Sequence, residues 1–299
     1  MKLAYLVLAH NNPKHFTRLV RAISGSDNQV FVHIDRKSDI TPFLLSESGV
    51  EYVPNRVSVF WGDYTQVEAI LELMRFALSK QASFDHLILL SGGDYPLQSQ
   101  KYIHDFFARN IGHEFIQMIP MPCNEGGKPI TRLTHYHLRN SDPPAYNAWL
   151  KLKLNLGLMP KERDYWQVLG EYKPYGGATW WALTESACRH IVDFIDTYPQ
   201  IAEFYKNTDC PDESLFHTIL GNSEFAAKLK PSITYTDWSK GGANPSPISE
   251  RHLDFFSRSP VIPASTSFVE KGEVLFARKF SDGSTAVLDK LDAMIGSRA

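Results

Sequence analysis

The sequence predicts an α/β fold, a central and mostly parallel β-sheet flanked by helices. The first observation is a set of short apolar runs typical of fully buried strands, at residues 3–9, 29–34 and 86–90. The second is a pair of amphipathic stretches with helical spacing, at residues 15–23 and 64–78. Strands that alternate with helices pair in parallel through right-handed crossovers, so we expect both faces of the sheet to be covered.

The elements are expected in chain order. Residues 3–9 form the first strand, and His10 follows it directly. Later strands and helices are expected at residues 115–118, 178–183, 186–195 and 211–220, and a final apolar run lies at 274–277. Residues 91–96 follow the third strand with small residues and an acid, where open α/β sheets hold their ligands. With no repeat and no long linker, residues 1–299 are predicted to form a single domain.

Composition narrows the function. The chain has 31 basic and 33 acidic residues, so a chain-wide grip on nucleic acid is not expected. Aromatic residues make up 12% of the chain, which fits a large core better than ligand stacking but allows both. Three scattered cysteines exclude a disulfide framework and a structural zinc site. The apolar N-terminal run is too short for a signal peptide or a membrane span, so we expect a cytoplasmic protein.

Several enzyme classes lose their usual motifs. The sequence has no phosphate-binding P-loop, no dinucleotide-binding glycine fingerprint, no Gly-x-Ser-x-Gly elbow and no His-Glu-x-x-His helix. It also lacks the Asp-x-Asp with which many nucleotide-sugar transferases hold a metal ion. In such an enzyme, cationic side chains would replace the metal, and Arg278 and Lys279 are the candidates.

Each candidate also has a plain structural interpretation. Arg278 and Lys279 could be a solvated strand end, and Asp212 and Glu213 could be ordinary acids at a helix N-terminus. Asp94 could cap a turn, and Asp35 could pair with a neighbouring Arg36 or Lys37 on the surface. Spacing alone leaves these alternatives open.

Seven segments taken together give a family resemblance. They occur in this order: VHIDRKS (32–38), WGDY (61–64), LSGGDYPL (90–97), GATWWALT (177–184), PDESLFHTIL (211–220), DWS (237–239) and FARKF (276–280). This set resembles the core-2/I-branching N-acetylglucosaminyltransferase and peptide O-xylosyltransferase family, glycosyltransferase family 14. The resemblance implies a GT-A-like fold, with a nucleotide-binding half at residues 1–120 and an acceptor and catalytic half at 121–299.

The resemblance also implies the chemistry: inverting transfer of GlcNAc or xylose from a UDP-sugar, with no cofactor and no divalent metal. Its acceptor would be a glycan or a lipid-linked oligosaccharide. Matching positions assign the general base to Glu213, the diphosphate to Arg278 and Lys279, the nucleotide to His10, Asp35 and Tyr64, and the sugar and acceptor cleft to Asp94, Trp180, Trp181 and Trp238.

The sequence also departs from the family pattern, and these departures affect what we expect of its membrane association and its substrates. The membrane anchor and the many cysteines of the animal branching enzymes are missing from this sequence, which suggests a bacterial relative that has no membrane span and associates with a membrane at most peripherally. Thr179 stands where xylosyltransferase-like members have an acid, so donor and acceptor identity stay open. Two alternatives remain: a non-catalytic UDP-sugar or glycan-binding protein that retains the fold, and a nucleotidyltransferase, which would need a metal-binding acid pair.

Overall fold

A seven-stranded sheet organises the molecule. The computed structural model describes residues 1–242, 244–258, 261–262 and 272–297. The strand order is β10-β6-β9-β4-β1-β2-β3. The strands are β1 (Leu3–Ala9), β2 (Asn28–Ile34), β3 (Val50–Tyr52), β4 (His86–Ser91), β6 (Glu114–Phe115), β9 (Ala182–Thr184) and β10 (Leu229–Lys230). Only β9 runs against its neighbours β4 and β6. The predicted α/β class with a mostly parallel central sheet is confirmed.

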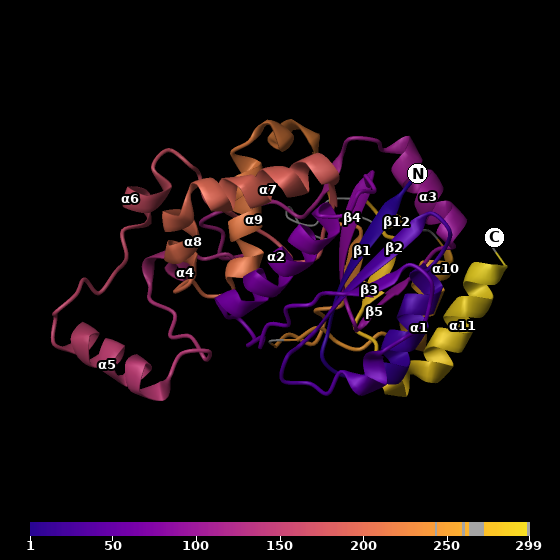
Figure 1. Ribbon diagram of the computed structural model, residues 1–299, viewed down its shortest axis with the longest axis horizontal. Helices are drawn as coiled ribbons and strands as arrows, with labels where there is room; N and C mark the ends of the chain where they lie inside the picture. Colours follow the sequence, from indigo (N-terminus) through magenta and orange to yellow (C-terminus); the bar gives the residue numbers. More distant parts are fainter. Residues whose placement is uncertain (243, 259–260, 263–271, 298–299) are drawn as a thin grey trace.

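Helices cover both faces of this sheet (Figure 1). The helices of the described residues are α1 (Pro13–Ile23), α2 (Tyr64–Leu78), α3 (Gln100–Arg109), α4 (Thr131–Thr134), α5 (Pro144–Asn155), α6 (Tyr165–Leu169), α7 (Glu185–Thr197), α8 (Pro199–Tyr205), α9 (Leu215–Gly221), α10 (Glu250–Arg258) and α11 (Thr285–Gly296). Among the described residues, no helix combines the length and apolar character needed to cross a bilayer.

Alternating side chains of the strands build two cores. In β1, Ala4 and Leu6 pack into the core beneath α2, α7 and α9, whereas Leu3, Tyr5 and Val7 pack into the core beneath α1, α3 and α11. This division follows from the two-residue period of a strand, which sends successive side chains to opposite faces. The continuous apolar runs in the sequence are therefore strands buried on both faces.

A smaller three-stranded sheet completes the architecture beside the carboxyl ends of the central strands. Its order is β11 (Thr234–Thr236), β14 (Phe276–Arg278) and β5 (Asp94–Pro96). Strand β14 pairs antiparallel with β5, and this register places Arg278 opposite Asp94. Two further pairs are short: β7 (Ile119–Pro120) with β8 (Tyr175–Gly176), and β12 (Val261–Ile262) with β13 (Gly272–Glu273).

The strand expected over residues 115–118 is wrong beyond Phe115, where β6 ends. Two further predicted elements need correction. The helix expected over residues 211–220 is interrupted: a 3-10 turn, η2 (Pro211–Glu213), is followed by Ser214 with φ of −145°, and only then by α9. The strand expected over residues 178–183 is confined to β9. Both breaks lie beside the candidate site, where residues 177–180 and 211–214 contact each other through side chains and backbone instead of a regular ladder.

Candidate active site

Arg278 and Asp94 form the core of a cationic site at the β5–β14 pair. Arg278 Nε lies 3.3 Å from Asp94 Oδ1, and the two side chains are 12% and 0% exposed. Asp94 also accepts hydrogen bonds from the Ser91 backbone nitrogen (2.9 Å) and from Ser91 Oγ (2.6 Å), so it caps the turn as well. The alternative interpretation, that Arg278 lies at a solvated strand end, is therefore wrong, because its side chain is largely buried.

The Trp180 ring covers this guanidinium. The Arg278 Cζ atom lies 4.1 Å from the ring centroid, within the range of a cation–π contact. No described residue accepts a hydrogen bond from Arg278 Nε. Burial lowers the pKa of Arg278, opposed by Asp94, yet an arginine remains charged under all ordinary conditions. A charged donor that lacks a full set of partners is suited to receiving an anionic ligand.

Lys279 extends the cationic site toward the ends of β1 and β2. Burial lowers its pKa, and the charge of Arg278 lowers it further. Burial also lowers the pKa of His10, and the nearby charge of Lys279 adds to this effect. Asp35 accepts hydrogen bonds from the backbone nitrogen and Nζ of Lys37, both at 2.8 Å. The structure therefore brings three predicted residues, His10, Asp35 and Lys279, to one edge of the sheet.

Glu213 lies at the end of η2 and is held by two cations. Its Oε2 accepts a hydrogen bond from Lys128 Nζ and another, of 2.8 Å, from Arg132 Nη1. Burial alone would raise the pKa of Glu213, but Lys128 and Arg132 outweigh it and hold the pKa below its ordinary value. The side chain is 28% exposed, and both cations contact the same oxygen. Glu213 is thus an ionised carboxylate with Oε1 left outside these ion pairs.

Neighbouring Asp212 lies in a different environment. It accepts hydrogen bonds from Thr179 Oγ1 (2.6 Å) and Gln66 Nε2 (3.2 Å). Burial, followed by the charge of Glu213, raises the pKa of Asp212 to about 6. The two adjacent carboxyl groups therefore have pKa values shifted in opposite directions, an arrangement found where acid–base roles are divided.

Two consecutive residues connect the carboxylate and cationic parts of the site. Thr179 donates to Asp212, and Trp180 stacks on Arg278. Glycines bring this segment against η2, since Gly177 donates its backbone hydrogen bond to the Glu213 carbonyl (2.9 Å). A Cβ on Gly177 would lie 2.0 Å from the Gln117 carbonyl oxygen, so only glycine fits there. The site is consequently one assembly and not two separate surface features.

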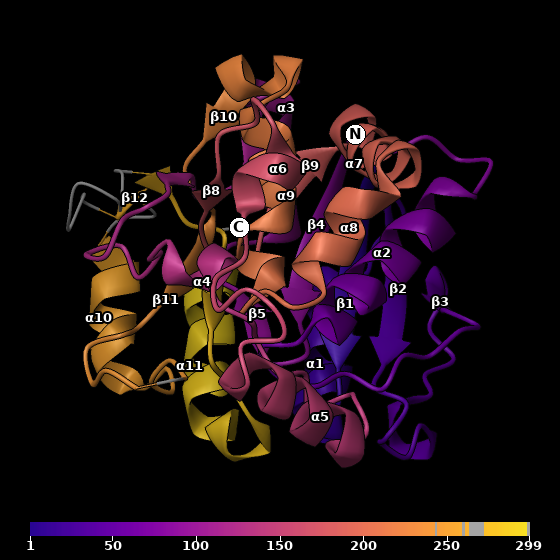
Figure 2. The ribbon, with the colours of Figure 1, turned by 90° about the vertical axis from the view of Figure 1, so that its left-hand side faces the viewer.

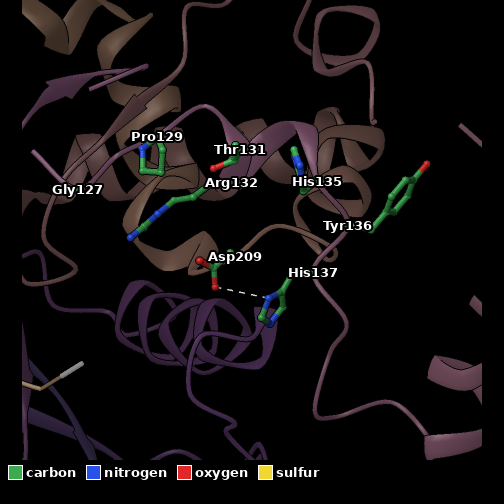
Figure 3. Close-up of a pocket in the computed structure, with 8 residues that line it drawn as sticks. All are labelled: Gly127, Pro129, Thr131, Arg132, His135, Tyr136, His137 and Asp209. Carbon is green, nitrogen blue, oxygen red and sulfur yellow. Dashed lines mark ion pairs between the residues drawn. The ribbon is translucent and has the colours of Figure 1, made fainter. Parts of the chain in front are cut away.

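A pocket of about 480 Å³ adjoins the carboxylate part (Figure 3). Arg132 and Asp209 line it, and His137 Nδ1 lies 3.5 Å from Asp209 Oδ1. The other lining residues are Gly127, Pro129, Thr131, His135 and Tyr136. Because Arg132 both lines this pocket and binds Glu213, it connects the pocket to the carboxylate.

Three predicted site residues lie elsewhere. Tyr64 is 4% exposed and belongs to the core beneath α2, and Trp181 is 1% exposed in the same core. Successive residues of an extended segment face opposite sides, so Trp181 points inward where Trp180 meets Arg278. Assigning Tyr64 to the nucleotide and Trp181 to the cleft is wrong for these buried side chains. Trp238 follows β11 and is 54% exposed, so its contact with a sugar stays a prediction.

Lys128 and Arg132 are the residues that sequence reasoning missed. They belong to a stretch, residues 126–141, that contains three basic residues and no acidic one. Such a run, opening with Gly-Gly-Lys-Pro, could have indicated that its charges meet a carboxylate from another part of the chain. Among the described residues, no group of three or more His, Cys, Asp or Glu side chains is placed to hold a metal ion.

Comparison with known sequences agrees with the resemblance drawn from the seven segments. The family described as Core-2/I-Branching enzyme matches residues 3–255. Human xylosyltransferase 2 is 25% identical over 315 residues, covering 98% of this chain and 33% of the human protein. Xylosyltransferase of Ciona intestinalis is 23% identical over 313 residues, covering 98% of this chain and 34% of that protein. The chain thus spans about a third of the length of the curated relatives it matches.

Solved structures show weaker likeness. Mouse xyloside xylosyltransferase 1 in its apo form has a TM-score of 0.37 at 10% identity, covering 92% of this chain and 97% of that one. The bifunctional glycosyltransferase WbbM has a TM-score of 0.36 at 10% identity, covering 78% and 39%. Because the family match extends over most of the sequence, the chain belongs to the Core-2/I-Branching enzyme family.

Proposed function

We propose that this protein is a glycosyltransferase that moves a sugar, GlcNAc or xylose, from UDP to a hydroxyl group of a glycan or lipid-linked oligosaccharide. Transfer would invert the anomeric carbon and need no divalent metal. Family membership supports sugar transfer in general. The donor and the stereochemistry rest on the family resemblance, and the residue roles rest on the site, above all on the Thr179–Trp180 segment, which joins Asp212, the neighbour of Glu213, to Arg278.

In this proposal Glu213 is the general base. An acceptor hydroxyl bound in the pocket beside Arg132 gives its proton to Glu213 Oε1 as its oxygen attacks the anomeric carbon. The oxygen–carbon bond forms on one face while the bond to UDP breaks on the other. The lowered pKa keeps Glu213 ionised and ready to accept this proton at neutral pH.

Arg278 and Lys279 would bind the leaving diphosphate. Charge develops on that group as its bond to the sugar breaks, so fixed cations stabilise the transition state more than the ground state. Their partial burial strengthens this attraction because water screens it less. His10 and Asp35, at the ends of β1 and β2, would contact the uridine.

The test is a panel of UDP-sugars scored by UDP release, with UDP affinity measured separately by calorimetry. Glu213→Gln should abolish turnover while UDP still binds, and Lys279→Ala should lose most turnover and weaken UDP binding. Glu224→Gln and Lys228→Ala, away from the site, serve as matched controls. Activity should persist in EDTA.

An active Glu213→Gln variant would refute the base assignment, and strict dependence on Mn²⁺ would refute the role of the cations in place of a metal. Binding of UDP-sugar or glycan without turnover would instead favour a non-catalytic binding protein. Cell fractionation would test the proposed cytoplasmic location.

A further inference from the structure

Helix α5 presents an apolar face that the fold does not use. Tyr146, Trp149, Leu152 and Leu156 are between 45% and 62% exposed, although such residues are usually buried. They follow one another at intervals of three or four residues, so they share one side of the helix. Leu150 is the one buried residue of α5. The outer face therefore offers a continuous apolar strip to a partner.

The position of α5 leaves this strip accessible. Figure 1 shows the helix at the periphery, away from the two sheets, and Figure 2 shows it on the side of the molecule that faces the viewer. Its N-terminal side is nevertheless tied to the body: Asn147 Nδ2 donates to the Arg139 carbonyl (2.8 Å), and Ser141 Oγ donates to Asp63 Oδ2 (3.0 Å). A helix held at one end and apolar on its outer side is arranged to dock on something outside the molecule.

The charged residues in and after α5 indicate what kind of partner the apolar strip would bind. Residues 143–161 contain Lys151, Lys153 and Lys161 and no acidic residue. Lys153 Nζ lies 3.7 Å from the centroid of the Trp149 ring, so an apolar and a cationic group occupy the same face. Tryptophan, tyrosine and leucine with interspersed lysines are the composition of helices that lie in a membrane interface, where rings enter the headgroup region and lysines meet anionic lipid.

We infer that α5 docks this protein on a membrane surface that contains anionic lipid. The helix has 12 residues, about half of what spanning a bilayer needs, so it lies on the surface. The segment that lines the candidate acceptor pocket, residues 127–137, precedes α5 in the chain, and α5 begins at Pro144. Docking would therefore bring that pocket close to the headgroups. Lipid binding itself requires no turnover, so this inference can be tested independently of the proposed transferase activity.

The test is co-sedimentation of the full chain with phosphatidylcholine vesicles, with and without phosphatidylglycerol. Wild type should bind the anionic vesicles and lose most binding in the neutral ones. Trp149→Ala/Leu152→Ala should weaken binding about tenfold through lost apolar contact. Lys151→Glu/Lys153→Glu should weaken it at least about tenfold, since each lysine near the surface contributes about a fivefold change.

Matched controls lie far from α5 in the chain. Ile111→Glu replaces an apolar residue that is 72% exposed, and Lys101→Glu reverses an exposed charge. Both should bind vesicles like wild type, and all variants should melt at the wild-type temperature. The inference is overturned if wild type ignores anionic vesicles or if the α5 variants bind them fully. It is also overturned if light scattering shows that α5 joins two copies of the chain.

Discussion

The Arg278 guanidinium lies over the ring of Trp180, with 4.1 Å between Cζ and the ring centroid. These residues are far apart in the chain, and their contact is where the segment beside η2 meets the end of β14. The ring covers one face of the guanidinium, while Asp94 Oδ1 forms an ion pair with it at 3.3 Å from Nε. The orientation of the main phosphate-binding candidate therefore depends on the ring of Trp180, which is also predicted to line the sugar and acceptor cleft.

Trp180→Ala should consequently weaken UDP binding by about 3-fold to 30-fold, since a cation–π contact of this kind contributes about 0.5–2 kcal/mol. Trp180→Phe should retain most of the affinity. Calorimetry with UDP gives the answer, and Trp166→Ala, at a tryptophan 54% exposed in α6, is the control. Equal UDP affinity in Trp180→Ala and wild type would disprove the role of the ring.

Lys128→Met should change the pH dependence of transfer. Lys128 lowers the pKa of Glu213, so its removal raises that pKa. A base with a higher pKa becomes protonated at a higher pH, so the acid limb of kcat/KM should move to higher pH. Lys161→Met, at an exposed position beyond α5, should leave the profile unchanged. An unshifted acid limb in Lys128→Met would show that Glu213 is not the titrating base.

Asp212→Asn should stabilise the protein above about pH 6. The pKa of Asp212 is about 6 in the folded protein against an ordinary value of 3.8, so the unfolded chain ionises first as pH rises. The group therefore costs stability that is absent below pH 3.8 and complete above pH 6. Removing the charge should regain on the order of 3 kcal/mol at neutral pH.

Thermal melts would check this at about pH 7.5 and about pH 4.5, and the gain over wild type should be larger at the higher pH. Asp193→Asn, at an exposed position in α7, should show no such difference. An equal gain at both pH values would mean that the stabilisation does not come from ionisation of Asp212.

Gly176→Ala should damage both stability and transfer. A Cβ at this position would lie 2.9 Å from Lys128 Cδ and 3.0 Å from the Glu213 carbonyl oxygen. Relieving that overlap must shift the lysine or η2, at a cost of about 1–3 kcal/mol. Turnover should fall more than UDP affinity, because the displaced groups surround Glu213. Gly296→Ala has open space around it and should melt and turn over like wild type; the same behaviour in Gly176→Ala would contradict the prediction.

Helices and strands that depend mainly on neighbouring residues in the chain could be predicted from the sequence. Strands β1, β2 and β4 are continuous apolar runs, and α2 begins directly after Asp63, which caps it through Thr65. The break at Ser214 could not be predicted from local pattern, because it depends on the contact between η2 and residues 177–179.

The candidate site, like the fold, could be predicted only in part from the sequence. His10 and Asp35 follow strands, and strand ends meet at one sheet edge, so their place could be argued in advance. The ion pairs of Glu213 with Lys128 and Arg132 join positions 81 or more residues apart and depend on tertiary packing. Nor could residue type show that Trp180 faces Arg278 while Trp181 faces the core, since the register of that segment decides it.

The pairing of β5 with β14 determines when, during synthesis, the candidate site becomes complete. Strand β14 follows every strand of the central sheet in the chain, and it carries Arg278 beside Lys279. During synthesis the sheet, η2 and Glu213 all leave the ribosome before these cations. A nascent chain would thus have its carboxylate long before its phosphate-binding residues, and chemistry at the site could begin only once β14 has closed onto Asp94.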